Sequence, residues 1–253
     1  ADSLELAATH PFYAPRSFTA KRVSYQRSFT QTTGMESSAG WETIALPFDV
    51  QQFVHSTKGD IAPFGKAANH HFWLAQYEGG AFVAATDLKA NVPYIIALPN
   101  NPEYGANSLS GSVSFTADNA TIQATDQLEG TVGDDFTFVP NYDALVADAG
   151  IYALNVGSKF DAYNAGSVFV PEKFKVNPFS AYIVASAKTQ GAPMFRIQMQ
   201  GESEEIVYEY TITSKNGIVY VTLPEERTIT VYDMMGRKVC AIDRQTGINE
   251  ITH

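Results

Sequence analysis

The sequence predicts an all-β protein, with a large β-sandwich-like domain followed by a small β-sandwich-type C-terminal domain. Aromatic residues make up 12% of the chain, including 16 Phe and 13 Tyr, and such side chains favour strands. Short apolar or alternating segments recur along the chain with turn residues between them, which is typical of sandwiches and barrels. Helical periodicity is nearly absent; only residues 50–55 and 143–149 could form a single helical turn.

The first expected strands differ in their pattern. Residues 18–30 alternate between polar and apolar side chains, as a half-buried strand does. Residues 40–50 form an apolar segment that Pro47 interrupts, because proline has no N–H to donate to a ladder. Residues 94–98 are a short, continuous apolar run between two prolines.

A hairpin is expected in the middle of this region. Residues 71–76 and 81–85 flank Tyr77-Glu78-Gly79-Gly80, and glycine readily accepts the positive φ of a tight turn. Further short strands are expected at residues 112–115, 121–124, 136–139, 151–154, 167–170, 181–185 and 194–199.

The chain is expected to divide near residue 200. We assign residues 1–200 to the large domain, residues 201–205 (Gly-Glu-Ser-Glu-Glu) to an acidic linker and residues 206–253 to the small domain. Asn216-Gly217 lies between two alternating segments there, which is the strongest short hairpin signal.

Composition excludes several classes of function. The net charge of −10, with no cluster of Lys and Arg, argues against nucleic acid as a partner. No apolar stretch reaches the length of a membrane span. A single cysteine, Cys240, cannot close an internal disulfide, which indicates either a reducing compartment or a core large enough to need no disulfide.

The segment Thr228-Ile-Thr-Val-Tyr-Asp-Met-Met-Gly-Arg-Lys-Val239 closely resembles the C-terminal domain of Bacteroidetes surface and secreted proteins. In some of those species this domain is the sorting signal of the type IX secretion system. The family pattern continues into a further strand and a basic tail that residues 248–253 do not match, so three alternatives are open: the end of the small domain is cut, it is disordered, or the domain is completed otherwise.

Residues 22–29 and 40–50 are more loosely similar to a recurring segment of uncharacterised Bacteroides and Prevotella surface proteins. Together the two resemblances imply a secreted or cell-surface protein of an anaerobe. They bring no catalytic residues with them.

Candidate metal ligands are sparse. His70 and His71, with His55 and Asp60 upstream, form the only histidine-rich stretch, but adjacent strand residues point to opposite faces. A second group consists of acidic residues that could supply oxygen ligands to calcium: Asp126, Glu129, Asp134, Asp135, Asp143 and Asp148. They lack EF-hand spacing, so no cofactor is expected, and calcium remains the alternative.

No catalytic motif occurs in the chain: there is no Gly-x-Ser-x-Gly elbow, no His-Glu-x-x-His and no phosphate-binding glycine loop. We therefore expect a non-enzymatic protein. Carboxylate pairs for glycoside hydrolysis cannot be tested by sequence in a chain with 27 acidic residues.

Aromatic residues are the best candidates for ligand contacts. Trp41, Trp73, Tyr77 and Phe82 could form a platform for a sugar ring, but both tryptophans lie in apolar strands and are expected in the core. Tyr104, Tyr142 and Tyr163, together with Tyr13, lie in expected loops and are predicted to be exposed contacts.

The leading hypothesis is an extracellular binding or adhesion module for a glycan or protein ligand, which it contacts through loops on a rigid frame. A structural spacer or assembly module of a larger surface protein is the alternative. A carbohydrate-active enzyme is the third. An exposed aromatic patch favours binding, a cleft with paired carboxylates favours catalysis, and a uniformly polar surface favours the spacer.

Overall fold

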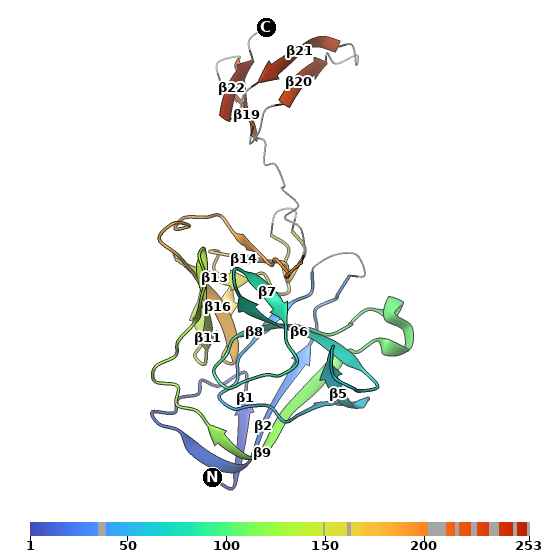
Figure 1. Ribbon diagram of the computed structural model, residues 1–253, viewed down its shortest axis with the longest axis vertical. Coiled ribbons are helices and arrows are strands. Elements are labelled where there is room, and N and C mark those ends of the chain that lie inside the picture. Colours follow the sequence, from blue (N-terminus) through green and yellow to red (C-terminus); the bar gives the residue numbers. More distant parts are fainter. Residues whose placement is uncertain are drawn as a thin grey trace. The chain divides into compact units, whose positions relative to one another are not determined.

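The computed structural model describes residues 1–34, 39–148, 150–160, 163–201, 211–215, 218–223, 227–232, 238–244 and 247–251. The chain forms two compact units, Ala1–Gly201 and Glu202–His253. The elements drawn in Figure 1 are nearly all strands, so the predicted all-β, sandwich-like fold is confirmed. The expected acidic linker lies, apart from Gly201, outside the described residues.

The larger unit contains one long, curled sheet. Its strands are hydrogen-bonded in the order β1-β2-β9-β4-β5-β6-β8-β3, and β7 pairs with β6. Their bounds are β1 Ser3–Ala7, β2 Phe18–Phe29, β3 Glu42–Ile44, β4 Gln52–His55, β5 Gly59–Pro63, β6 His71–Glu78, β7 Ala81–Ala84, β8 Tyr94–Ala97 and β9 Gly111–Ile122. The longest pairing joins β2 to β9, which run antiparallel side by side (Figure 1).

A second sheet in the same unit has six strands in the order β10-β11-β16-β13-β14-β17. Their bounds are β10 Thr131–Val132, β11 Phe136–Asn141, β13 Ile151–Leu154, β14 Val168–Val170, β16 Ser180–Ala185 and β17 Phe195–Arg196. A short pair, β12 (Leu145–Val146) and β15 (Lys175–Val176), lies outside both sheets.

Both expected helical turns are wrong. Residues 52–55 form β4, because Phe53 and His55 are buried on one face of the sheet while Gln52 is exposed. Residues 145–146 form β12, because they pair with residues 175–176. The described helix is instead the 3₁₀ segment η1 (Pro102–Asn107), which Asn101 caps by accepting a hydrogen bond from the N–H of Glu103.

The expected hairpin is confirmed as β6 and β7. Glu78 pairs with Ala81, and both residues of the two-residue turn, Gly79 and Gly80, have positive φ. Positive φ at both central positions defines the type I′ turn, whose twist matches that of the flanking strands.

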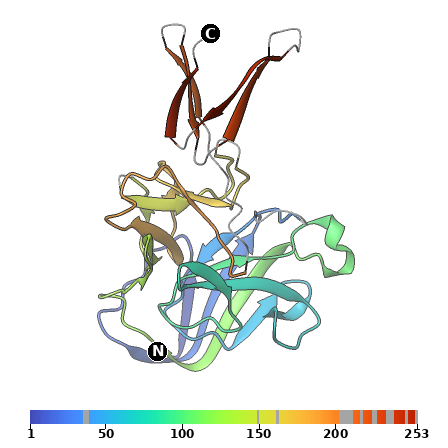
Figure 2. The ribbon, with the colours of Figure 1, turned by 45° about the horizontal axis from the view of Figure 1, so that its top comes forward.

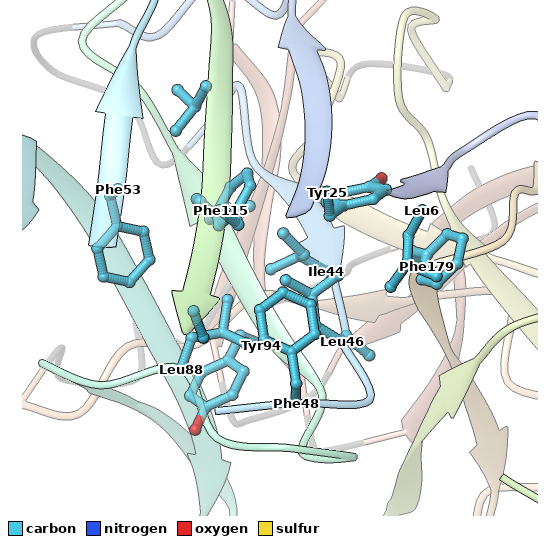
Figure 3. Close-up of a cluster of buried hydrophobic side chains, with 14 of the residues drawn as sticks. Leu6, Tyr25, Ile44, Leu46, Phe48, Phe53, Leu88, Tyr94, Phe115 and Phe179 are labelled. Carbon is cyan, nitrogen blue, oxygen red and sulfur yellow. The ribbon is translucent and has the colours of Figure 1, made fainter. Parts of the chain in front are cut away.

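Two apolar clusters form the core of the larger unit. The first cluster fills the inside of the curled sheet (Figure 3). The second lies between the β6–β7–β8 region and the six-stranded sheet, which appears as a separate layer in Figure 2. β8 is buried on both faces: Tyr94 and Ile96 belong to the first cluster, and Ile95 and Ala97 to the second. This is why the run 94–98 is continuously apolar rather than alternating.

A buried ion pair joins opposite ends of the curled sheet. Arg27 of β2 is ion-paired with Glu42 of β3 and donates a second hydrogen bond to the carbonyl oxygen of Thr43, 2.6 Å away. The two side chains are only 15% and 5% exposed. Since β3 ends the sheet on one side and β2 lies next to the other end, these contacts close the curl.

The segment around β3 also holds the second sheet. Trp41 N donates to Gly166 O at 3.0 Å, Ala45 N to Phe179 O at 3.2 Å, and Ala181 N to Thr43 Oγ1 at 3.0 Å. Gly166 allows this approach, because a Cβ built on it would lie 2.5 Å from the carbonyl oxygen of Trp41.

The smaller unit also consists of strands. A three-stranded sheet is formed by β18 (Thr211–Lys215), β19 (Ile218–Leu223) and β22 (Gly247–Ile251), and a separate pair by β20 (Arg227–Tyr232) and β21 (Lys238–Arg244). Lys215 pairs with Ile218, as the expected hairpin requires, while the turn residues 216 and 217 lie outside the described residues. Residues 233–237 of the Bacteroidetes-like segment also lie outside them.

Replacing Arg27 with leucine should destabilise the larger unit by about 3–5 kcal/mol, because Glu42 would remain buried without its partner. The double variant Arg27→Leu/Glu42→Leu should regain much of this loss, since no unpaired charge is then buried. Urea unfolding followed by near-ultraviolet circular dichroism measures both. A single variant with an unchanged midpoint would contradict the closing role of the pair.

Gly166→Ala tests the close approach between the sheets, with Gly191→Ala as the matched control. Both glycines have positive φ, at 68° and 86°, but nothing lies within 4 Å of a Cβ built on Gly191. The control should cost about 1–2 kcal/mol of backbone strain, and Gly166→Ala about 1–3 kcal/mol more from the clash with Trp41. Equal thermal midpoints for the two variants would refute the steric argument.

Candidate functional site

A row of neighbouring rings, one pair stacked and two pairs tilted, lies at the surface of the larger unit. We call Phe64, His71, Trp73 and Tyr104 the aromatic row. Phe64 directly follows β5, and His71 and Trp73 lie two residues apart on the neighbouring strand β6, so their side chains share one face. The ring centroid of Phe64 lies 5.2 Å from that of His71 and 5.3 Å from that of Trp73.

Tyr104 of η1 extends the row, with its ring centroid 5.8 Å from that of Trp73. Its hydroxyl donates a hydrogen bond to the carbonyl oxygen of Gly34 at 3.1 Å, which fixes the orientation of the ring. Phe64 is 47% exposed, and the other three side chains are half-buried. The ring contacts and the hydrogen bond of Tyr104 thus hold these side chains in place while part of their apolar surface stays accessible to solvent.

Polar groups flank one end of the aromatic row. The imidazole of His71 donates through Nε2 to the carbonyl oxygen of Lys66 at 2.9 Å, and the Lys66 ammonium lies 2.6 Å from the Asp87 carboxylate. The hydrogen bond from Lys66, and to a smaller extent the one from Thr86, lowers the pKa of Asp87, so this carboxylate stays ionised. A charged donor and a charged acceptor therefore lie at the end of the row where His71 is found.

The other end of the row is tied to η1. The Asn101 side-chain amide donates to the Thr33 carbonyl oxygen at 3.1 Å, and its oxygen accepts from Glu103 N at 3.0 Å. Glu103 is exposed next to Tyr104. The row therefore has polar side chains at both ends.

The expectation that both tryptophans lie in the core is half right. Trp41 is buried in the second cluster at 7% exposure, as are Tyr77 and Phe82. Trp73 is only half-buried, because it lies at the margin of that cluster while Ala75 and Tyr77 on the same face of β6 lie inside it. Phe64 was not predicted from the sequence as a contact residue; the available signal was a large apolar residue directly before a glycine in a turn.

A concave site, which we call the hollow, lies elsewhere on the unit and has a volume of about 380 Å³. Its lining includes Phe12 and Tyr13 of the N-terminal segment, Leu128 of a loop, Tyr142 and Asp143 after β11, and Tyr182 of β16. Phe12 N donates to Tyr142 O at 2.9 Å, which ties the N-terminal segment to the end of β11. A volume of this size suits a small molecule.

The prediction of Tyr142 as an exposed contact is wrong, since it is only 3% exposed. Its hydroxyl donates to Asn91 Oδ1 at 2.8 Å, and its ring packs against Phe12 and Phe179. Burial raises the pKa of Tyr142 well above its usual value. The residue forms part of the wall of the hollow, whereas Tyr13 is 69% exposed at the same site.

Tyr163 lies neither in the aromatic row nor in the wall of the hollow. It is half-buried, with the Arg196 guanidinium 4.9 Å from its ring centroid and hydrogen-bonded to its hydroxyl. Of the three tyrosines predicted as contacts, Tyr104 therefore lies in the aromatic row and Tyr142 in the wall of the hollow, and Tyr163 stacks with an arginine.

The candidate metal ligands do not converge. Among the described residues, no three His, Cys, Asp or Glu side chains form a group that could hold a metal ion. His55 is buried, and burial lowers the pKa of its imidazole, which favours the neutral form. Its Nε2 donates a hydrogen bond to Ser110 O at 3.1 Å, and its Nδ1 accepts one from Thr57 N at 3.3 Å. The geometry therefore gives no support to zinc or calcium.

In the part of the chain that is described, no helix has the length and apolarity needed to cross a membrane. Comparisons with known proteins add no identity: no family model, no curated protein sequence and no solved structure matches this chain.

Proposed function

We propose that the chain is a non-enzymatic, secreted or cell-surface module that binds a glycan through the aromatic row. The observation that carries this proposal is the contiguous set of rings, from His71 through Phe64 and Trp73 to Tyr104, with the partly exposed Phe64 among them. Large exposed apolar patches on soluble domains mark interaction sites.

The chemistry of the row favours a sugar. A pyranose presents an apolar face of C–H groups surrounded by hydroxyls, and an aromatic ring can cover that face. The Lys66–Asp87 pair at one end and Glu103 at the other can exchange hydrogen bonds with the hydroxyls. The rings are tilted by 37° and 58° along the row, which suits a twisted chain of sugars more than a flat crystalline surface.

Two features argue against the other readings. A spacer needs neither an exposed aromatic row nor a hollow. A glycosidase needs two carboxylates across a cleft, whereas the described residues that line the hollow include one carboxylate, that of Asp143. The proposed location outside the cell rests on the resemblance of residues 228–239 to Bacteroidetes secreted proteins.

The test is a glycan array with the purified chain, followed by calorimetry on any glycan that binds. Phe64→Ala should weaken binding at least about tenfold if this ring is a central contact. Because Phe64 is 47% exposed, the variant should fold normally. Phe18→Ala, which removes another exposed phenylalanine (36%), is the matched control and should change nothing.

Two outcomes would reject this proposal. One is a well-folded protein that binds no glycan on the array, which would favour the spacer. The other is a glycan whose affinity is the same for Phe64→Ala and the unchanged chain.

A further inference from the structure

The charge of the hollow is one-sided. Among the described residues that line it, Asp143 is the only charged one, and none is Lys or Arg. Asp126 and Glu129 are exposed on the loop that contributes Thr125 and Leu128 to the lining. With the net charge of −10, this arrangement attracts cations and repels anions.

The carboxylate of Asp143 is held in place by the backbone. Its Oδ1 accepts a hydrogen bond from Ala144 N at 2.7 Å, and this is its one hydrogen bond within the described part of the chain. The second oxygen can therefore accept from a ligand. An exposed carboxylate with a fixed orientation attracts an alkylated ammonium ion through its charge, even where the ion has no N–H to donate.

Aromatic side chains supply much of the remaining wall. Phe12, Tyr13, Tyr142 and Tyr182 all line the hollow. The exposed fractions of these residues differ, from 69% for Tyr13 to 3% for Tyr142. Aromatic faces next to a carboxylate are the chemistry that recognises alkylated ammonium ions.

Two polar side chains of the wall, those of Asn141 and Thr125, are already hydrogen-bonded within the protein. The Asn141 side-chain amide donates to the carbonyl oxygens of Asp143 and Asn177 and accepts from Asp143 N. Thr125 Oγ1 accepts from Ala14 N at 2.8 Å. A sugar would need such groups for its hydroxyls, whereas an alkylammonium ion needs apolar contact and one negative charge.

We propose that the hollow is a second binding site, separate from the aromatic row, and that its ligand is a small organic cation with an alkylated ammonium group. The ammonium group lies against Asp143 and its alkyl groups contact the aromatic wall. This site does not depend on glycan binding by the row.

The probe is choline, compared with its neutral isostere 3,3-dimethyl-1-butanol in titrations followed by calorimetry or ligand-observed NMR. Choline should bind saturably, and the isostere at least about tenfold more weakly, because only choline gains the charge interactions. Equal affinities, or no saturable binding of choline, would overturn the proposal.

Two variants identify the site. Asp143→Asn should weaken choline binding about tenfold or more, while Asp118→Asn, an exposed residue of β9 with the same change in net charge, should alter it less than about twofold. Tyr13→Ala should weaken choline binding roughly fivefold through loss of a cation–π contact. If Asp143→Asn and Asp118→Asn behave alike, the hollow is not the site.

Phe64→Ala separates this proposal from the glycan proposal. It should leave choline binding unchanged, because Phe64 does not line the hollow. Loss of choline binding in that variant would place the cation at the aromatic row and overturn the assignment to the hollow.

Discussion

The fold of the larger unit depends on the closure of one sheet by Arg27. An open sheet of this length would leave the β3 edge unpaired and its inner face exposed. Arg27 covers that edge by bonding Thr43 O while its charge is balanced by Glu42. A hydrophobic pair could stabilise the closure as well, but it would not hydrogen-bond the carbonyl of an edge strand. The geometry of the arginine fork therefore explains why a charge is buried here.

Closure in turn determines how the second sheet is attached. Once β3 is held against β2, its flanking residues present backbone groups toward the six-stranded sheet, which bonds them through Gly166 and Phe179. β8, next to β3, then has one apolar cluster on each face. A single strand, the second from the end of its sheet, thus belongs to both cores, and a change in its register would disturb both, since a slip by one residue exchanges the two faces.

Local signals predicted the strands well and their partners poorly. The hairpin at Gly79-Gly80 and the double-sided burial of β8 both follow from short patterns in the sequence. The segments 112–115 and 121–124, expected as two strands, form the single strand β9, because pairing with β2 carries it through the polar residues between them. Tyr142 was assigned to an exposed loop because its burial depends on Phe12 and Phe179, which are far away in sequence. Site residues that depend on such long-range contacts have no local signal.

The aromatic row and the hollow both lie at the margin of a sheet, where the residues packed against that sheet end. Trp73 is only half-buried because it lies at the margin of the second cluster, which includes Ala75 and Tyr77 of β6, and the rings of Phe64 and of Tyr104 in η1 contact it there. The hollow forms where the N-terminal segment crosses the end of β11 and leaves a gap between Tyr13 and Tyr182. At such margins aromatic side chains are supported from one side by the core and free on the other. A sandwich of two unequal sheets necessarily has these margins, so ligand sites can evolve there without disturbing the buried ion pair that holds the sheet closed.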